Sequence, residues 1–292
     1  MKSAVCAVAR NENAYLLEWI DYHLNLGFDK IFLYDNNDPE DDSVYVLLAS
    51  YIADQKVEVI DYRGRKNFQL AAYNECYKNN GCLFDWIAFI DLDEFITFGP
   101  EAETDQINVF LKEFDSFDVI EINWMVYNDN GKILKEEGGV IERFPEPANL
   151  SHPINKHVKS VVRTNRLLTF VRNPHCVDGD LRIADDSMNV MLKSEPFKEP
   201  SYNRLYIRHY NTKTLEEFIL CKIHRGAADS DVNSWRYNLY SFYHYNERTV
   251  EKRRLERRLC PLKVVLMTDF EMFLKTIGLG RFAGRRLLHK KG

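Results

Sequence analysis

The sequence has neither closely paired cysteines nor a long apolar run, and each absence excludes a class of protein. Its six cysteines are scattered without a C-x-x-C pair, which argues against a metal cluster or a disulfide scaffold. No apolar run approaches the roughly 20 residues that a helix needs to cross a membrane. Residues 1–8 are too soon followed by charge to form a signal peptide. We therefore expect a protein of the reducing cytoplasm.

What the chain does contain is enough apolar material for a large core. Of its 292 residues, 45% are hydrophobic and 13% are aromatic. The net charge of −5 is unevenly spread, because residues 248–292 carry 13 Lys or Arg against 4 Asp or Glu. The acidic remainder argues against nucleic acid as a partner. The basic tail predicts a helix that packs on the core or makes peripheral contact with the inner face of a membrane.

Strand-like and helix-like patterns alternate over the first third of the chain. Apolar runs predict strands, and apolar residues at helical spacing predict the helices between them. This order predicts an α/β fold with a parallel, doubly wound sheet, in which ligands bind at the carboxyl ends of the strands. The expected strands cover residues 4–9, 30–34, 57–60 and 86–90, and the expected helices cover residues 16–24, 43–52 and 68–77.

The pattern after residue 98 is less regular. Residues 123–155 are rich in Gly, Pro and polar side chains and predict a long loop, and residues 173–203 have no clear pattern. We expect one domain over residues 1–228, followed by a helical C-terminal extension over residues 229–292 that packs on it. Further helices are expected at 104–114 and 215–223, and further strands at 119–122, 157–162, 167–171 and 205–207.

The strongest chemical signal is a pair of carboxylates directly after an apolar run. Five apolar residues, 86–90, indicate a strand buried on both faces, and Asp91 and Asp93 follow it. At the end of a strand both side chains can reach one cation outside the sheet edge. Mg²⁺ and Mn²⁺ prefer such oxygen ligands and are often coordinated by one or two carboxylates together with substrate phosphates. The sequence therefore predicts a site for a divalent metal and a diphosphate.

Three chemistries use such a carboxylate pair. A P-loop ATPase is excluded because the only Gly-Lys pair, Gly131-Lys132, lacks the rest of the phosphate-binding motif. A phosphatase of the haloacid dehalogenase type would use Asp91 as nucleophile and Asp93 as acid, but Phe95 is not the companion residue expected there. The third chemistry is glycosyl transfer from a sugar nucleotide.

An ordered set of motifs over residues 5–228 favours the third chemistry. The chain resembles GT-A type glycosyltransferases, and most closely family 92 and the related family 2-like group. The resemblance implies a GT-A (Rossmann-like) fold with a mixed, mainly parallel sheet flanked by helices. The motifs include Val8-Ala9-Arg10-Asn11-Glu12, Tyr34-Asp35-Asn36-Asn37, Asp91-Leu92-Asp93-Glu94, Asn173-Pro174-His175 and Arg208-His209-Tyr210.

The resemblance also implies which residues bind the nucleotide and a Mn²⁺ or Mg²⁺ ion. Asp91 and Asp93 match the metal motif, and His175 or His209 is implied as a further metal ligand. We prefer His175, because a polar Asn-Pro-His turn presents a ligand better than an alternating strand does. Arg65 follows the third strand, within reach of a diphosphate. The full set of predicted nucleotide and cofactor contacts is Arg10, Asn11, Glu12, Asp35, Asn36, Arg65, Gln69, Asn74, Asp91, Leu92 and Asp93.

The family is similar to inverting transferases, which implies a carboxylate base for the acceptor hydroxyl. The expected reaction moves a hexose of the galactose or glucose type from a nucleotide-diphosphate sugar, UDP-linked, to a glycan or glycolipid. Trp124 could stack on a sugar. A haloacid dehalogenase-like phosphatase and a non-catalytic sugar-nucleotide or glycan-binding relative stay open as alternatives. The candidate bases are Glu94, Glu137, Asp185 and Asp186.

Overall fold

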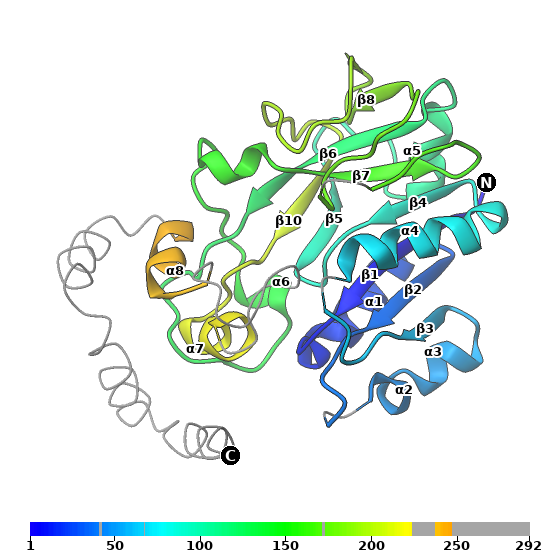
Figure 1. Ribbon diagram of the computed structural model, residues 1–292. Coiled ribbons are helices and arrows are strands. Elements are labelled where there is room, and N and C mark those ends of the chain that lie inside the picture. Colours follow the sequence, from blue (N-terminus) through cyan, green and yellow to red (C-terminus); the bar gives the residue numbers. More distant parts are fainter. Residues whose placement is uncertain (41–42, 67, 171–172, 224–236, 247–292) are drawn as a thin grey trace. The chain divides into compact units, whose positions relative to one another are not determined.

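The computed structural model describes residues 1–40, 43–66, 68–170, 173–223 and 237–246 (Figure 1). Ten strands within these residues form one sheet, with the order β3-β2-β1-β4-β7-β6-β10-β5; β8 pairs with β6, and β9 pairs with β8. This arrangement confirms the mixed, mainly parallel α/β sheet. The described residues belong to one compact unit, Met1–Glu247. The proposed boundary at 228/229 stays a prediction, and most of the predicted C-terminal extension lies outside the described residues.

The first half of the sheet is parallel, as its pattern predicted. β1 pairs in parallel with both β2 and β4, and β2 pairs in parallel with β3. The carboxyl ends of these four strands therefore lie at the same edge of the sheet. Their bounds are Ser3–Ala9 for β1, Lys30–Asp35 for β2, Val57–Asp61 for β3 and Trp86–Phe89 for β4.

The second half of the sheet is mixed, and its strand directions bring more chain ends to that same edge. β7 is antiparallel to both β4 and β6, and β10 is parallel to β6 but antiparallel to β5. The starts of β5 and β7 consequently lie beside the ends of β4, β6 and β10 (Figure 1). The bounds are Glu94–Phe98 for β5, Val119–Val126 for β6, Val158–Arg163 for β7, Ile183–Asp185 for β8, Val190–Met191 for β9 and Leu205–His209 for β10.

Helices cover both faces of the sheet. Val5 and Ala7 of β1 pack with residues of α1 and α5, whereas Ala4 and Cys6 pack with residues of α4. Burial on both faces explains why the parallel strands are continuously apolar. The helices are α1 (Asn13–Asn25), α2 (Val44–Leu47), α3 (Ala49–Ala53), α4 (Gln69–Asn80), α5 (Ile107–Glu113), α6 (Val140–Arg143), α7 (Leu215–Phe218) and α8 (Leu239–Tyr245), with the short turns η1 (Gly81–Leu83), η2 (Pro153–Lys156) and the π-helical η3 (Ile219–Ile223).

Several elements differ from the sequence predictions. The helix expected at 43–52 is split at Leu48 into α2 and α3, with Ser43 capping α2. The strand expected at 167–171 is wrong for its described part, where Thr169 makes only an isolated bridge to Asp178. Its apolar pattern arises because Leu168 and Phe170 pack on the α4 face of the sheet. The strands β5, β8 and β9 were not predicted.

The long loop expected at 123–155 is also interrupted by regular structure. β6 continues to Val126, and α6 and η2 lie further along the segment. Asn123 is tolerated inside β6 because its side-chain amide donates to backbone carbonyls, including that of Asn155 at 3.2 Å. Among the described residues, no helix has both the length and the apolar character required to cross a bilayer.

Candidate active site

The strand directions gather carboxylates and a histidine at one edge of the sheet. Asp91 and Asp93 follow β4, and Glu94 begins β5. His209 ends β10 and lies directly opposite Glu94 in the antiparallel register. These side chains come from residues 91–94 and 205–209, which are more than 100 positions apart in the sequence. They meet only because β5 and β10 pair in the folded sheet.

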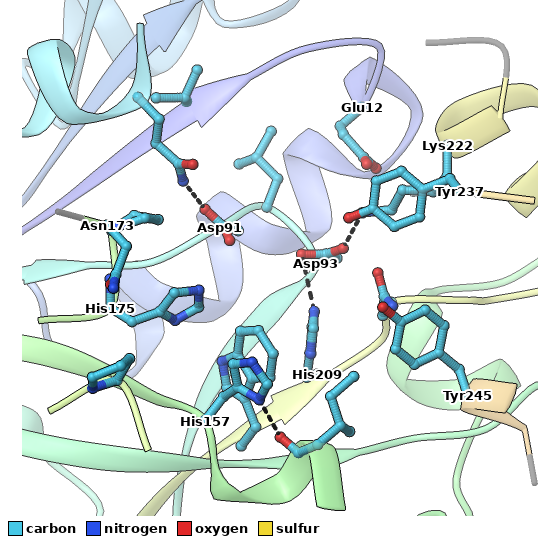
Figure 2. A pocket seen from close by; sticks show the side chains of 18 of the residues that line it. Glu12, Asp91, Asp93, His157, Asn173, His175, His209, Lys222, Tyr237 and Tyr245 are labelled. Carbon is cyan, nitrogen blue, oxygen red and sulfur yellow. Dashed lines mark hydrogen bonds and ion pairs between the residues drawn. The ribbon is translucent and has the colours of Figure 1, made fainter. Parts of the chain in front are cut away.

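A cavity of about 370 Å³ opens at this edge (Figure 2). Its lining combines acidic, basic and aromatic side chains, with Asp91 and Asp93 facing the same space. Cavities of this size with a few converging polar groups are typical of ligand sites. The predicted site residues that line it are Arg10, Glu12, Gln69, Asp91, Leu92, Asp93, His175 and His209.

The Asp91 carboxylate is held by three hydrogen-bond donors. Its Oδ1 accepts from Gln69 Nε2 at 2.6 Å and from the Tyr73 hydroxyl at 3.2 Å. Its Oδ2 accepts from Lys159 Nζ at 2.9 Å. Burial opposes the charge, but the Lys159 ammonium outweighs it and keeps the pKa of Asp91 below the usual range. Asp91 is therefore ionised and fixed in orientation.

Asp93 has a different set of partners. Lys222 Nζ, from η3, lies 2.5 Å from its Oδ2, and His209 Nε2 lies 3.6 Å from its Oδ1. Burial again opposes the charge, yet Lys222 and His209 hold the pKa of Asp93 well below the usual range. Asp93 thus carries a full negative charge beside an imidazole and an ammonium group.

Glu94 adds a third carboxylate behind the pair. It is fully buried, and its Oε2 accepts from the backbone N–H of Asp91 at 3.0 Å. Its Oε1 lies 3.7 Å from Lys159 Nζ and has no hydrogen-bond partner among the described residues. Burial, only partly offset by Lys159, raises the pKa of Glu94 well above its ordinary value. Of the three carboxyl groups, only Asp91 and Asp93 are held in the charged form, each beside one ammonium group, and Glu94 Oε1 is the acceptor left over.

The arrangement fits a divalent cation. Asp93, Glu94 and His209 each place a ligand atom so that the three atoms lie within 4.8 Å of one another. Carboxylate oxygens and imidazole nitrogens are accepted ligands of Mn²⁺. The orphaned Oε1 of Glu94 gives this set a buried ligand atom without another hydrogen-bond partner among the described residues.

His209 is better placed for this set than His175, which the sequence favoured. His175 also lines the cavity, but its Nδ1 pairs with the Val158 carbonyl at 2.9 Å. Burial and the nearby Lys159 lower the pKa of His175 to about 3, so its ring is neutral. The sequence preference overlooked that β10 pairs with β5, which places His209 opposite Glu94.

Several predicted nucleotide contacts lie behind the cavity lining. The Asn11 backbone N–H donates to Asn37 Oδ1 at 2.7 Å, with Asn11 at a φ of 54°. Asp35 is fully buried, and its Oδ2 has no hydrogen-bond partner among the described residues. The Asn36 amide donates to the Tyr62 carbonyl at 2.5 Å and accepts from Arg10 at 3.4 Å. These residues shape the loops from which Arg10 reaches the cavity.

Arg65 and Asn74 have structural contacts of their own. The Arg65 guanidinium lies 3.9 Å from the ring centroid of Tyr62, a cation–π contact. The Asn74 side chain accepts from the backbone N–H of Phe170 at 2.9 Å and donates to its carbonyl at 3.0 Å. Asn74 thereby fastens α4 to residue 170 and does not line the cavity.

None of the four predicted bases, Glu94 included, is among the described residues that line the cavity. Glu137 is exposed on the segment before α6. Asp185 accepts from the backbone N–H groups of Ser187 and Asn189, both at 2.9 Å, and so closes the turn between β8 and β9. Asp186 accepts from the backbone N–H of Arg204 at 2.9 Å. Because its oxygens close a turn, Asp185 has a structural role in this part of the chain.

Two lysines of the site were given no role from the sequence. Lys159 lies in β7 with no exposed surface, and Lys222 is nearly as buried. The signal for Lys159 was a lysine inside the apolar run Val158-Lys159-Ser160-Val161-Val162, because an unpaired charge is not tolerated in a buried strand. Lys222 interrupts a helical apolar pattern in the same way.

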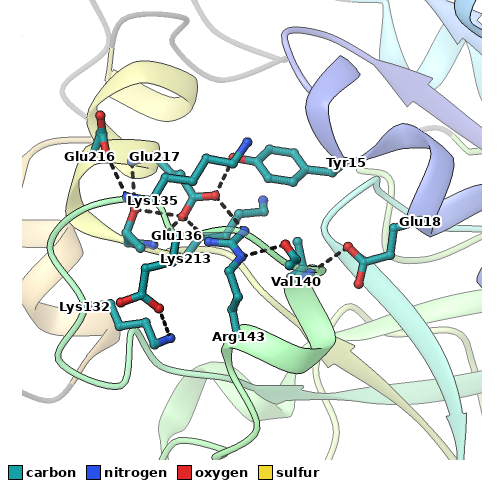
Figure 3. Close-up of polar contacts among 12 residues, drawn as sticks. Tyr15, Glu18, Lys132, Lys135, Glu136, Val140, Arg143, Lys213, Glu216 and Glu217 are labelled. Atoms are coloured by element: carbon teal, nitrogen blue, oxygen red, sulfur yellow. Dashed lines mark hydrogen bonds and ion pairs between the residues drawn. The ribbon is translucent and has the colours of Figure 1, made fainter.

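A second buried ionic cluster joins α1, α6 and α7 (Figure 3). The Arg143 guanidinium donates to both oxygens of Glu217, at 3.0 and 2.8 Å. Glu217 also accepts from the Tyr15 hydroxyl at 2.8 Å and from the Thr214 hydroxyl at 2.7 Å. The hydrogen bonds outweigh burial and lower the pKa of Glu217 to about 2. Glu18 caps the start of α6, accepting from the backbone N–H of residue 140 at 2.6 Å.

Comparison with known proteins identifies the family. The model of glycosyltransferase family 92 matches residues 2–216. A glycosyltransferase family 92 protein of Ricinus communis is 34% identical over 92 residues, which make up 31% of this chain and 16% of that protein. A family 92 protein of Oryza sativa subsp. japonica is 34% identical over 95 residues, or 32% of this chain and 16% of that protein. The matched segment is thus a small part of each relative's length.

Similarity to solved structures is weaker. The structure of S. aureus TarS 1–349 in complex with UDP-GlcNAc aligns with a TM-score of 0.43 and 14% sequence identity. The alignment covers 84% of this chain and 64% of that chain.

Proposed function

Because the chain belongs to glycosyltransferase family 92, we propose that it transfers a hexose from a nucleoside-diphosphate sugar to a hydroxyl of a glycan or glycolipid, with inversion. The observation that carries this proposal is the meeting of Asp91, Asp93 and His209 in one cavity at the carboxyl edge of the sheet, with Glu94 buried next to them. We further propose a UDP-linked donor and a sugar of the galactose or glucose type, as the sequence motifs suggest.

Asp93, Glu94 and His209 are the proposed ligands of a Mn²⁺ or Mg²⁺ ion. Such an ion, when bound, supplies positive charge that offsets the charge developing on the departing diphosphate. Asp91 is fixed by Gln69 and Lys159 and presents a second carboxylate to the cavity beside Asp93. This assignment gives Glu94 a role in metal binding in place of the base role that the sequence suggested.

Arg10 and Glu12 are the proposed contacts to the nucleotide within the cavity. Both follow β1 and line the cavity. Asp35, at the end of β2, is also proposed as an acceptor for a base or ribose group, although its unpartnered Oδ2 is buried behind the cavity lining. We also propose that the basic residues 248–292, outside the described part of the chain, bring the protein to the cytoplasmic face of a membrane.

A non-catalytic binding module is the second candidate, and one observation favours it. Lys159 and Lys222 already neutralise Asp91 and Asp93. A site balanced in this way could bind a nucleotide through its cations without needing a metal. The two candidates differ in whether metal is required and whether the donor is turned over.

The test is release of nucleoside diphosphate from a panel of sugar nucleotides, measured with glycan acceptors and with MnCl₂ titrated in. We expect metal-dependent release, and Asp93→Asn should lower it about 10²- to 10³-fold, as loss of a charge-stabilising group does in other enzymes. Asp105→Asn, an exposed aspartate in the loop before α5, is the matched control and should leave the rate unchanged.

Two outcomes would contradict the transferase. Nucleotide binding that needs no metal and is followed by no turnover would favour the binding module. Release of phosphate from p-nitrophenyl phosphate would favour the phosphatase.

A further inference from the structure

The aromatic side of the cavity is built differently from what the sequence suggested. Trp124, the expected sugar platform, is only 7% exposed. His157 is stacked on it, with ring centroids 4.7 Å apart and an interplanar angle of 13°, and His209 contacts it at 4.0 Å. With His175 edge-on at 5.1 Å, its ring is engaged by three imidazoles, so Trp124 supports the site without offering a ring face to a ligand.

Phe197 is the accessible aromatic ring of this group. It lines the cavity and is 56% exposed, although its ring meets His157 edge-on with centroids 4.5 Å apart. An exposed phenylalanine alone would need no explanation. This one lies at the mouth of the proposed active site and continues the ring series from Trp124 through His157 to solvent.

The backbone holds Phe197 firmly in this place. Residues 157 and 197 form an antiparallel bridge. On either side of it, the backbone N–H of Val158 donates to the Pro196 carbonyl at 3.3 Å, and that of Lys198 donates to the Lys156 carbonyl at 2.9 Å. A ring fixed by its backbone loses little conformational freedom when a ligand packs on it.

The strand order places the aromatic side opposite the nucleotide side. Arg10 and Glu12 follow β1, the carboxylates follow β4, and His157 precedes β7. Because β4 lies between β1 and β7 in the sheet, the carboxylates separate the two sides of the cavity. If the diphosphate lies at the carboxylates with its nucleoside toward β1, the acceptor has to approach from the side of His157 and Phe197.

We propose that Phe197, backed by His157, is the acceptor subsite, and that a pyranose ring of the acceptor glycan packs its C–H face on the Phe197 ring. This inference rests on the proposed function. C–H groups of a sugar carry slight positive charge and suit the negative face of an aromatic ring. Asn173 and Asn211 line the same cavity and offer amide groups for the sugar hydroxyls.

The experiment measures sugar and nucleotide binding separately on the full chain. The probes are methyl β-D-galactopyranoside and methyl β-D-glucopyranoside. Their binding is measured by saturation-transfer NMR with and without UDP and MnCl₂. UDP binding is measured by calorimetry. The variants are Phe197→Ala, Phe197→Tyr, which keeps the ring, and Leu192→Ala, a fully exposed control on the same segment.

We expect Phe197→Ala to weaken binding of at least one glycoside roughly three- to tenfold, the range of one aromatic contact. UDP binding should stay unchanged, and Phe197→Tyr and Leu192→Ala should match the wild type. The subsite is overturned if the wild type binds neither glycoside, if Phe197→Ala binds them normally, or if it weakens UDP equally, which would place the nucleobase on this ring. Failure of the proposed function would appear separately, as a wild type that does not bind UDP.

Discussion

Two ionic clusters are buried in this protein, and they differ in how completely their groups are paired. In the sealed cluster of Tyr15, Arg143, Thr214 and Glu217, both carboxylate oxygens accept hydrogen bonds. In the cavity cluster of Asp91, Asp93, Glu94, Lys159 and Lys222, acids outnumber lysines and Glu94 Oε1 has no hydrogen-bond partner among the described residues.

The comparison shows that burial of charge does not by itself mark a functional site. A saturated pair such as Arg143 and Glu217 has no capacity for a ligand and serves to position the chain, here by holding α6 against α7. The cavity cluster keeps spare acceptors and borders open space, which is what ligand binding requires. A structural cluster and a ligand site are therefore distinguished by two features together: whether the buried charges are fully paired, and whether they border a cavity.

The largest expected effect comes from a substitution that disrupts the sealed cluster. Arg143→Met leaves the Glu217 carboxylate buried without its counter-ion, and we expect the free energy of unfolding to fall by about 3–5 kcal/mol. Urea denaturation followed by circular dichroism measures it. The double variant Arg143→Met/Glu217→Gln removes the orphaned charge and should recover part of the loss. A single variant as stable as the wild type would show that the pair is not formed.

A second prediction extends the comparison of the two clusters to Glu121, a buried acid that belongs to neither of them. Glu121, in β6, accepts hydrogen bonds from the Ser160 and Ser194 hydroxyls and has no exposed surface. Burial outweighs these bonds and raises the pKa of Glu121 from 4.5 to about 7. The folded protein therefore holds this proton at pH values where the unfolded chain has released it.

The sign follows from that difference in bound protons. The free energy of unfolding should fall as pH rises from about 4.5 to about 7. The Glu121 contribution to this fall is on the order of 3 kcal/mol and does not change further above about pH 7. Glu121→Gln should flatten this part of the profile, measured by urea denaturation at pH 5, 6, 7 and 8. Glu137→Gln, on the exposed loop, is the control. Parallel profiles for wild type and Glu121→Gln would refute the raised pKa.

The fold was largely predictable because local patterns and pairing agreed over the first four strands. Continuous apolar runs, polar residues after the strands and a glycine after the first helix, Gly27 with a φ of +104°, all agree with the same sheet. β5 was missed because Glu94, its first residue, looks like part of an acidic turn. Its place in the sheet depends on pairing with β10, more than 100 residues later.

The candidate site was predictable only where neighbouring residues carry it. Asp91 and Asp93 adjoin an apolar strand, so that their chemistry could be argued from spacing. The metal set of Asp93, Glu94 and His209 depends on the register between β5 and β10, which no local pattern encodes. Lys159 could have been suspected from its apolar strand, but which carboxylate it meets depends on the pairing of β7 with β4.

The smallest predicted effect tests whether the cavity cluster is open to a cation. Lys222 Nζ lies 2.5 Å from Asp93 Oδ2, the group proposed to bind the metal. Removing this ammonium in Lys222→Met takes away a competing positive charge, so that Mn²⁺ affinity without nucleotide should rise about tenfold. Calorimetric titration with MnCl₂ measures it, with Lys132→Met, a lysine paired to Glu136, as control. An unchanged affinity would mean that Lys222 and the metal do not share Asp93, and the contrast with the sealed cluster would then rest on Glu94 alone.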